Sequence, residues 1–223
     1  MTLNTTQIPE SCLASVSGST FVNADCFDVF PFIEDKSIDA IICDLPYGTT
    51  SQKWDIVLPF DKLWAEYERI IKPNGAIIFT ASQPFTTELI MSNRKDFRYC
   101  LVWDKGRSSG SMLCNVMPLK YHEDVVVFYS EKPTYNPQMV KCEPHKRNHS
   151  KGNMKQPQKN SCYGNFIETP TIITDEKFPT SIVSISKEHE TGNGVFPCII
   201  VQTKQELDSA RNFLTKTDYY QYQ

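Results

Sequence analysis

The chain has 223 residues, of which 40% are apolar and 22% are charged, and its formal net charge at pH 7 is −3. This is ordinary globular usage, and the length suffices for one domain with a substantial core. No apolar run approaches the length of a membrane span, and the first thirty residues lack a basic leader followed by an apolar stretch, so we expect a cytoplasmic protein without membrane contact.

Cysteine usage points to the same compartment. The eight cysteines, at positions 12, 26, 43, 100, 114, 142, 162 and 198, show no paired spacing of the kind that holds a metal. Two of them fall inside apolar, strand-like runs. We therefore expect reduced thiols in a reducing compartment and no metal site.

Strands and helices are predicted to alternate from about residue 20 to residue 130. The predicted strands cover 20–23, 38–43, 76–80, 97–103 and 124–129. Between them lie a short helical turn at 27–33 and helices at 61–72 and 84–91. Strands separated in this way imply right-handed crossovers and a mainly parallel sheet covered on both faces, so the predicted fold class is α/β and Rossmann-like.

A polar tetrapeptide, Asp44-Leu45-Pro46-Tyr47, ends the apolar strand 38–43. Open α/β sheets bind ligands at this carboxyl edge of their strands. The Asp44 carboxylate and the carbonyl of Leu45 or Pro46 can each accept one hydrogen of an amino group on a ring, and the Tyr47 ring offers a face for stacking. The alternative is a plain turn from strand to loop in which the proline is useful.

This tetrapeptide resembles the Asp-Pro-Pro-Tyr signature of DNA amino-methyltransferases, which transfer a methyl group from S-adenosylmethionine to adenine N6 or cytosine N4. Leu45 replaces the first proline, at a position that would contribute only backbone. The longer string 44–55, DLPYGTTSQKWD, resembles the phage and bacterial adenine-specific branch, whose catalytic motif precedes its cofactor glycine loop. The resemblance implies Asp44, Pro46 and Tyr47 as catalytic residues, S-adenosylmethionine as cofactor and duplex DNA as substrate, with cytosine N4 as the alternative target.

A second acid precedes the catalytic strand. In the resembled family a Gly-Asp pair after the previous strand faces the adenine amino group of the cofactor, and here Ala24 stands in place of the glycine before Asp25. The resemblance thus implies Asp25, Cys26 and Asp44 as cofactor contacts. Asp is also a preferred N-cap, so Asp25 can equally cap the turn that begins at Phe27.

Other strand ends match the family's general pattern at 82–85, 103–105 and 121–123. Packing or anchoring of loops explains each of these residues at least as well as a direct role. His122 is not needed as a general base, because a carboxylate hydrogen-bonded to the amine and an exit to water suffice for proton loss.

The segment 141–159 is basic within an acidic chain. It carries a single acid, Glu143, and is rich in Asn, Gln, Pro and Gly. The predicted DNA-binding residues in it are Lys141, Lys146, Arg147, Lys151 and Lys155, with Lys159 close behind. We predict a mobile loop that meets phosphates, and the resemblance implies a target-recognition insertion at 136–177 in a core of 1–135 and 178–223. The alternative is a solvated basic loop without a role in binding.

The resemblance ends near residue 188. The family's strand and Phe-x-Gly-x-Gly loop for the cofactor are missing, and 192–194, Gly-Asn-Gly, lacks a preceding apolar strand. The chain ends instead with a predicted strand at 198–201 and a helix at 205–214. The fold is therefore predicted to be incomplete on the cofactor side, with an open sheet edge beside Asp25, and the strand 198–201 is expected either to add at that edge or to lie elsewhere.

Two classes of function remain open at this point. The chain is either a working adenine methyltransferase, completed by its tail or by a second chain, or a catalytically impaired fragment that binds DNA or a partner. A third class, methylation of RNA or of a protein amide, is disfavoured by Asp44 and by the basic insertion.

Overall fold

Two compact units make up the chain in the computed structural model: Met1–Thr134 with Ser181–Gln223, and Tyr135–Thr180. The structure describes residues 8–9, 12–16, 19–148, 158–160, 164–166, 171–184 and 199–201. The predicted helix at 205–214 and the glycines at 192–194 lie outside these residues.

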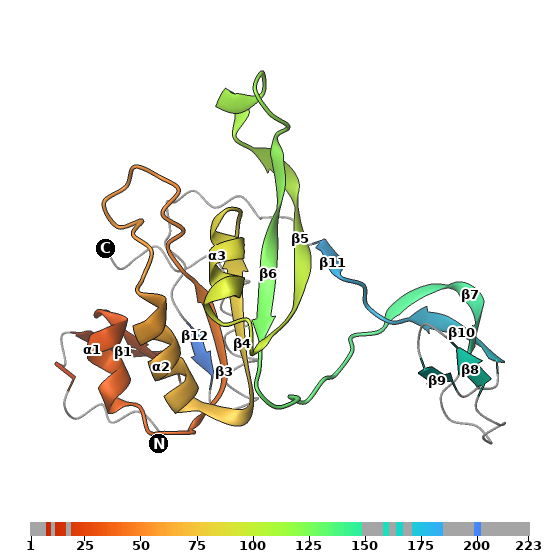
Figure 1. Cartoon of the computed structure of the whole chain (residues 1–223), viewed down its shortest axis with the longest axis horizontal. Helices are drawn as coiled ribbons and strands as arrows, with labels where there is room; N and C mark the ends of the chain where they lie inside the picture. The colour runs from red at the N-terminus through yellow and green to blue at the C-terminus, as the bar shows by residue number, and fades with distance from the viewer. Residues whose placement is uncertain are drawn as a thin grey trace. The chain divides into compact units, whose positions relative to one another are not determined.

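A six-stranded sheet organises the described part of the first unit, in the order β11-β5-β6-β4-β3-β12 (Figure 1). Its strands are β3 (Ile38–Asp44), β4 (Ile71–Ala81), β5 (Phe97–Ser109), β6 (Lys120–Phe128), β11 (Ile182–Ser184) and β12 (Ile199–Val201). β3, β4, β5 and β11 point the same way, whereas β6 and β12 run in the opposite direction. The mainly parallel α/β, Rossmann-like fold predicted from the sequence is confirmed.

Two helices follow their predicted ranges closely: α2 is Phe60–Ile70 and α3 is Phe85–Ser92. α2 buries Leu63, Trp64, Tyr67 and Ile70 on one side, as their spacing predicts. The predicted turn at 27–33 is α1 (Cys26–Val29) followed by η3 (Phe30–Phe32).

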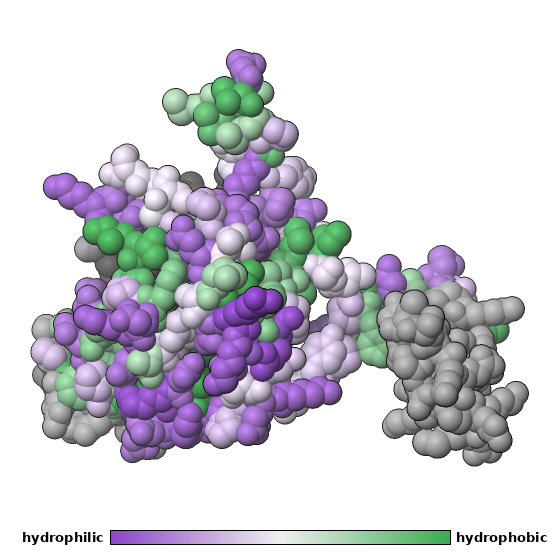
Figure 2. Space-filling view, viewed as in Figure 1, coloured by the Kyte–Doolittle hydropathy of each residue, from purple (hydrophilic) through white to green (hydrophobic). Residues whose placement is uncertain are grey.

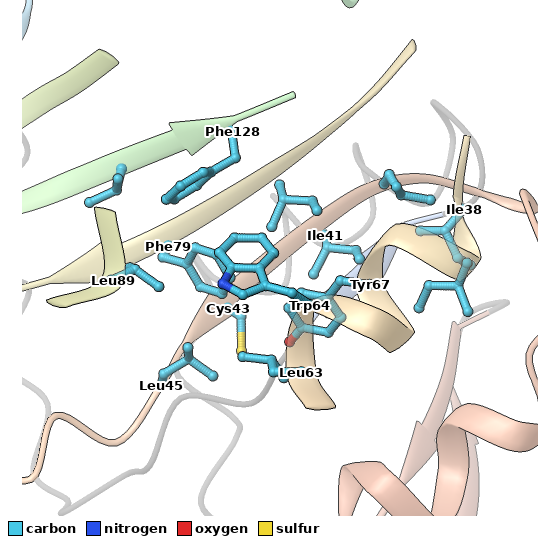
Figure 3. Close-up of a cluster of buried hydrophobic side chains, with 14 of the residues drawn as sticks. Ile38, Ile41, Cys43, Leu45, Leu63, Trp64, Tyr67, Phe79, Leu89 and Phe128 are labelled. Atoms are coloured by element: carbon cyan, nitrogen blue, oxygen red, sulfur yellow. The ribbon is translucent and has the colours of Figure 1, made fainter. Parts of the chain in front are cut away.

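An aromatic cluster holds α2 against the sheet (Figure 3). The Trp64 ring lies 5.7 Å from that of Phe79 and 4.9 Å from that of Phe128, and Tyr67 stacks on Phe79 at 6.0 Å. Phe79 and Phe128 are fully buried. Such aromatic contacts add to the free energy of burying the rings, so this cluster fixes β4 and β6 beneath the helix.

The opposite face of the sheet is less covered. Ala40 and Ile42 of β3 and Ala76 and Ile78 of β4 are half-buried, in alternation with the buried positions. The described helices α2 and α3 pack against each other and contribute Leu63, Trp64 and Leu89 to one core. The expectation of helices on both faces is therefore not met within the described residues.

The strand predicted at 20–23 is β2 (Ser19–Val22). The prediction that it belongs to the main sheet is wrong. It pairs only with β1 (Leu13–Val16) in a separate two-stranded sheet. The edge beside β3 is taken by β12, antiparallel, with Ile199 opposite Ile42. Three consecutive β-branched residues make β12 a good strand former, and it adds to the edge of β3 over three residues, one of the two placements expected for the strand 198–201.

In the second unit, the described residues of the segment predicted as a mobile loop, 141–148 and 158–159, lie in strands. β7 (Val140–Asn148) pairs with β10 (Thr171–Lys177), and β8 (Gln158–Asn160) pairs with β9 (Gly164–Phe166), both antiparallel. The basic segment thus begins in a strand. The β-branched run Thr171 to Thr174 supplies its partner, a cue that lies outside the basic segment itself.

Candidate active site at the carboxyl edge of β3

Asp44 is the last residue of β3, and it lies in register with Thr80 near the end of β4. The Tyr47 hydroxyl lies 2.7 Å from Asp44 Oδ1, and Thr80 Oγ1 donates a short hydrogen bond to the same oxygen. Two donors thus fix one carboxylate oxygen. In the part of the chain that the structure describes, no donor reaches Oδ2, which leaves this oxygen as an acceptor for a ligand.

Tyr47 is held from two sides. Its ring stacks on Phe85, the first residue of α3, with centroids 5.2 Å apart and an angle of 24° between the planes. Burial, and then the charge of Asp44, raise the pKa of Tyr47 far above its ordinary value of 10.0. The phenol therefore stays protonated and donates to Asp44 at any physiological pH. Because Phe85 covers one face of the ring, a heterocycle that stacks on Tyr47 must use the other face.

The loop after Tyr47 is folded around one buried carboxylate. Asp55 Oδ1 accepts from the Gly48 amide at 2.7 Å, and Oδ2 accepts from the Thr50 amide at 2.6 Å. Burial by itself raises the pKa of Asp55, but hydrogen bonds from Thr50, Gly48 and Thr49 outweigh it and leave that pKa below its ordinary value. Gly48 has φ +67°, and an added Cβ would lie 2.9 Å from Val57, so glycine is required there.

Two lysines enter the same edge from β5 and β6. Lys105 Nζ lies 2.5 Å from Glu123 Oε1, and both side chains are largely buried. Lys120 Nζ donates to Ser82 Oγ, and burial lowers the pKa of Lys120 although Glu123 opposes this shift. Neither these lysines nor Thr80 were predicted from the sequence as site residues. Thr80 could have been found as the polar residue that ends the next parallel strand.

Of the three predicted cofactor residues, Asp44 ends β3, whereas Asp25 and Cys26 lie on another element. Asp25 is the N-cap of α1, where its Oδ1 accepts from the Phe27 amide at 2.8 Å, and Cys26 begins that helix. The capping role foreseen for Asp25 is therefore present. On the side of β3 away from β4, the neighbouring strand is β12. It runs antiparallel to β3, so its first residue, Ile199, is the one nearest to the end of β3 that carries Asp44.

The predicted DNA-binding residues fall in the second unit. Lys141, Lys146 and Arg147 lie on β7, and the register places Lys141 opposite Glu176 of β10. Lys151 and Lys155 lie outside the described residues. One acid of β10, Glu176, thus lies opposite a basic residue of β7, a pairing that the sequence alone did not reveal.

Other kinds of site find little support. Within the described ranges, no group of three or more His, Cys, Asp and Glu side chains is placed to hold a metal ion. None of the helices described there is long and apolar enough to cross a membrane. A shallow hollow near Lys36, Lys72 and Gly75 lies at the opposite edge of the sheet from Asp44.

Comparison with known proteins gives one curated relative over part of the chain. No protein-family model matches the chain. Over 97 residues the sequence is 27% identical to the type II methyltransferase M1.MboII of Moraxella bovis, a match that covers 39% of this chain and 37% of that protein. In this segment the chain is homologous to a type II DNA methyltransferase. It spans well under half the length of that curated relative.

The matches among solved structures are partial. The M1.HpyAVI–SAM complex matches with a TM-score of 0.40 at 17% identity, over 52% of this chain and 56% of that one. The PvuII DNA methyltransferase, which is cytosine-N4-specific, matches with a TM-score of 0.43 at 9% identity, over 77% and 58% respectively.

The Asp55 cap yields a prediction for the loop. Asp55→Asn keeps the size of the side chain but turns an amide donor toward one of the two backbone N–H groups. We expect hydrogen exchange of the Gly48 and Thr50 amides to quicken about tenfold or more. Asp61→Asn, at an exposed position in the first turn of α2, is the control. Unchanged protection in Asp55→Asn would show that the carboxylate does not hold the loop.

The same cap has a defined pH dependence. Because the folded-state pKa of Asp55 lies below its ordinary value of 3.8, its contribution to stability is complete above that value and is lost as the pH falls through the folded-state pKa. Protection of the two amides should therefore stay constant at neutral pH and fall only under strongly acidic conditions.

Proposed function

We propose that the chain is an S-adenosylmethionine-dependent DNA methyltransferase that methylates adenine N6 in duplex DNA. The observation that carries this proposal is the asymmetric Asp44 carboxylate, with Oδ1 bound by Tyr47 and Thr80 and Oδ2 open to a ligand. The homology to M1.MboII over 97 residues supports the same class of reaction.

The geometry suits an exocyclic amine. Asp44 Oδ2 accepts one amine hydrogen, and the backbone carbonyl of Leu45 or Pro46 accepts the other. Two acceptors draw the nitrogen lone pair away from the ring and toward the methyl donor, which raises its nucleophilicity. Tyr47 and Thr80 keep the carboxylate from rotating, so no reorganisation is needed when the amine arrives.

The bond changes follow from this arrangement. S-adenosylmethionine supplies an electrophilic methyl group when bound. At the amine an N–C bond would form as the methyl–sulfur bond of the donor breaks and its electron pair stays on sulfur. The extra proton would leave along the hydrogen bond to Asp44 Oδ2 or to water. The half-buried Tyr47 phenol does not take part in this transfer, because its raised pKa keeps its own proton in place.

The choice of adenine rests on the resemblance of the string 44–55, and cytosine N4 is the second target. Asp55 and Gly48 belong to that string, and they have a defined task in shaping the loop. An amine target on either base fits the Asp44 acceptors, so the identity of the methylated base is decided by analysing the product.

The cofactor side is the less complete half. The described residues fit the acceptor side of the reaction, whereas Asp25 already caps α1 and β12 runs antiparallel to β3. A strand in that direction brings its N-terminal end to the catalytic edge, not a carboxyl-end turn that leads into a helix. We therefore propose that a second chain contributes to the cofactor site.

A second candidate function follows from the same observation. It is that of a catalytically impaired fragment, which retains DNA binding without holding the cofactor, with or without a partner. The basic residues Lys141, Lys146, Arg147, Lys151 and Lys155 are proposed to supply that binding through DNA phosphates.

Asp44→Ala tests catalysis. It removes both carboxylate oxygens, so we expect methyl transfer into DNA to fall by about a hundredfold or more while DNA affinity changes little. Asp39→Ala is the matched control, because Asp39 lies near the other end of β3 and pairs with Lys72. An Asp44→Ala protein with unchanged turnover would overturn the assignment. Mass spectrometry of nucleosides from the methylated DNA identifies the base.

Charge removal tests the basic segment. We expect the triple variant Lys146→Ala, Arg147→Ala and Lys151→Ala to bind duplexes of any sequence more weakly. The slope of log affinity against log salt should shrink by about 0.9 for each phosphate that the variant no longer neutralises. Replacing Lys62, Arg94 and Lys95 by Ala removes the same charge from exposed positions of the first unit. Equal slopes for the two triple variants would refute the proposed role.

Calorimetric titration with S-adenosylmethionine tests the cofactor side. For the chain alone we expect binding at about millimolar or weaker, because several charge-assisted hydrogen bonds of about 1.5–3 kcal/mol each are not supplied by the described residues. Micromolar binding by the monomer would show that the chain builds the pocket by itself and needs no second chain.

A further inference from the structure

The long hairpin of β5 and β6 carries an exposed apolar end that the proposed chemistry does not use. We call the segment 110–119 the arm tip. It contains η4 (Ser111–Leu113) and the side chains of Met112, Leu113, Val116, Met117 and Leu119. Met112 is 97% exposed and Val116 76% exposed. Figure 2 shows these hydrophobic side chains gathered at the end of the arm. Exposed apolar clusters of this kind mark surfaces that contact another molecule.

The arm rises from the catalytic edge. Asp44 lies in register with Thr80, Thr80 with Val125 and Val125 with Leu101, so β5 and β6 pass the level of the carboxylate and continue beyond it (Figure 1). From Val125 to Lys120 the strand covers five further residues, or roughly 17 Å at about 3.4 Å per residue. The arm tip therefore projects past the edge at which a base would be methylated.

The tip has a defined backbone conformation. The amides of Leu113 and Val116 donate to the carbonyls of Gly110 and Leu113, each at 2.9 Å, and the Met117 amide also donates to Leu113 at 3.0 Å. Gly110 has φ +81°, the left-handed conformation that allows the turn. The apolar side chains are thus presented on a folded turn.

The charged residues near the arm tip are basic, which indicates the kind of molecule that the arm contacts. Between residues 105 and 122 the chain has Lys105, Arg107 and Lys120 and no Asp or Glu. Lys105 is paired with Glu123 at the base of the arm, whereas Lys120 reaches Ser82 at the catalytic edge. The stretch 105–122, which contains no carboxylate side chain, suits a polyanion, and an apolar end on it suits the stacked bases inside such a polyanion.

We propose that the arm tip inserts Met112 and Val116 into the base stack of the DNA duplex, as an apolar wedge beside the base presented to Asp44. This inference rests on the proposed function. A base inside a duplex must leave the stack before its amine can reach a carboxylate, and this costs a few kcal/mol of stacking and pairing. Side chains such as Met, Leu and Ile open base steps in proteins that kink DNA. A wedge that projects past the catalytic edge would hold open the gap that the extruded base leaves in the stack.

The test uses the full chain and duplexes that need no recognition sequence. One duplex is intact, and the other has a single abasic site flanked by 2-aminopurine, whose fluorescence rises when it is unstacked. We expect the wild-type chain to bind the abasic duplex about tenfold more tightly and to raise the fluorescence. Met112→Ser combined with Val116→Ser should abolish both effects and leave the salt slope unchanged, because no charge is removed.

Met91→Ser is the matched control, since Met91 is a 62% exposed methionine on α3 and lies outside the arm. It should behave as the wild type. A double variant that keeps the abasic preference and the fluorescence rise would overturn the wedge, as would light scattering that shows the tip to join two copies of the chain. Loss of methyl transfer in Asp44→Ala with the wedge signals intact would separate the two proposals, and a wild-type chain that binds no DNA would overturn both.

Discussion

The parallel pairing of β3 with β4 is the constraint on which the rest of the site depends. It places Thr80 beside Asp44, and Thr80 and Tyr47 together bind one carboxylate oxygen. The pairing is held from below by Phe79, one residue before Thr80, which packs fully buried against Trp64 and Tyr67. Because neighbouring strand residues point to opposite faces, β4 places Phe79 in the core and, one residue later, Thr80 beside the Asp44 carboxylate.

Packing also determines the orientation of the Tyr47 side chain at the site. Its ring rests on Phe85, itself buried at the start of α3, so the position of this helix sets the position of the phenol. The hydroxyl then points to Asp44 and not to solvent. The ring and the hydroxyl of Tyr47 have separate tasks. The ring holds the side chain against Phe85 on one face and offers its other face for stacking. The hydroxyl donates to Asp44 Oδ1, so that a ligand amine is directed to Oδ2.

The sequence predicted the elements whose signal is local. The apolar run 38–43 located Asp44, and the spacing of Leu63, Trp64 and Tyr67 located α2. It did not predict contacts that depend on register, such as Thr80 with Asp44. Nor did it predict the length of β5, because Gly106-Arg107-Ser108-Ser109 has neither apolar character nor alternation and becomes a strand only through its pairing with β6.

The sequence pattern likewise did not predict the direction of β12. Three β-branched residues predict a strand, but they carry no information about its neighbour or its direction, and the edge of β3 accepts either. The consequence is an uneven catalytic edge. The amine-binding half is built from β3, β4 and the capped loop at Asp55, and the arm of β5 and β6 extends from the same edge. The half beside β12 lacks, within the described residues, the strand-to-helix turn that usually receives a cofactor in this fold class. In the proposed reaction, the described residues beside β3 and β4 thus organise the target side, and the proposed second chain contributes on the side of β12.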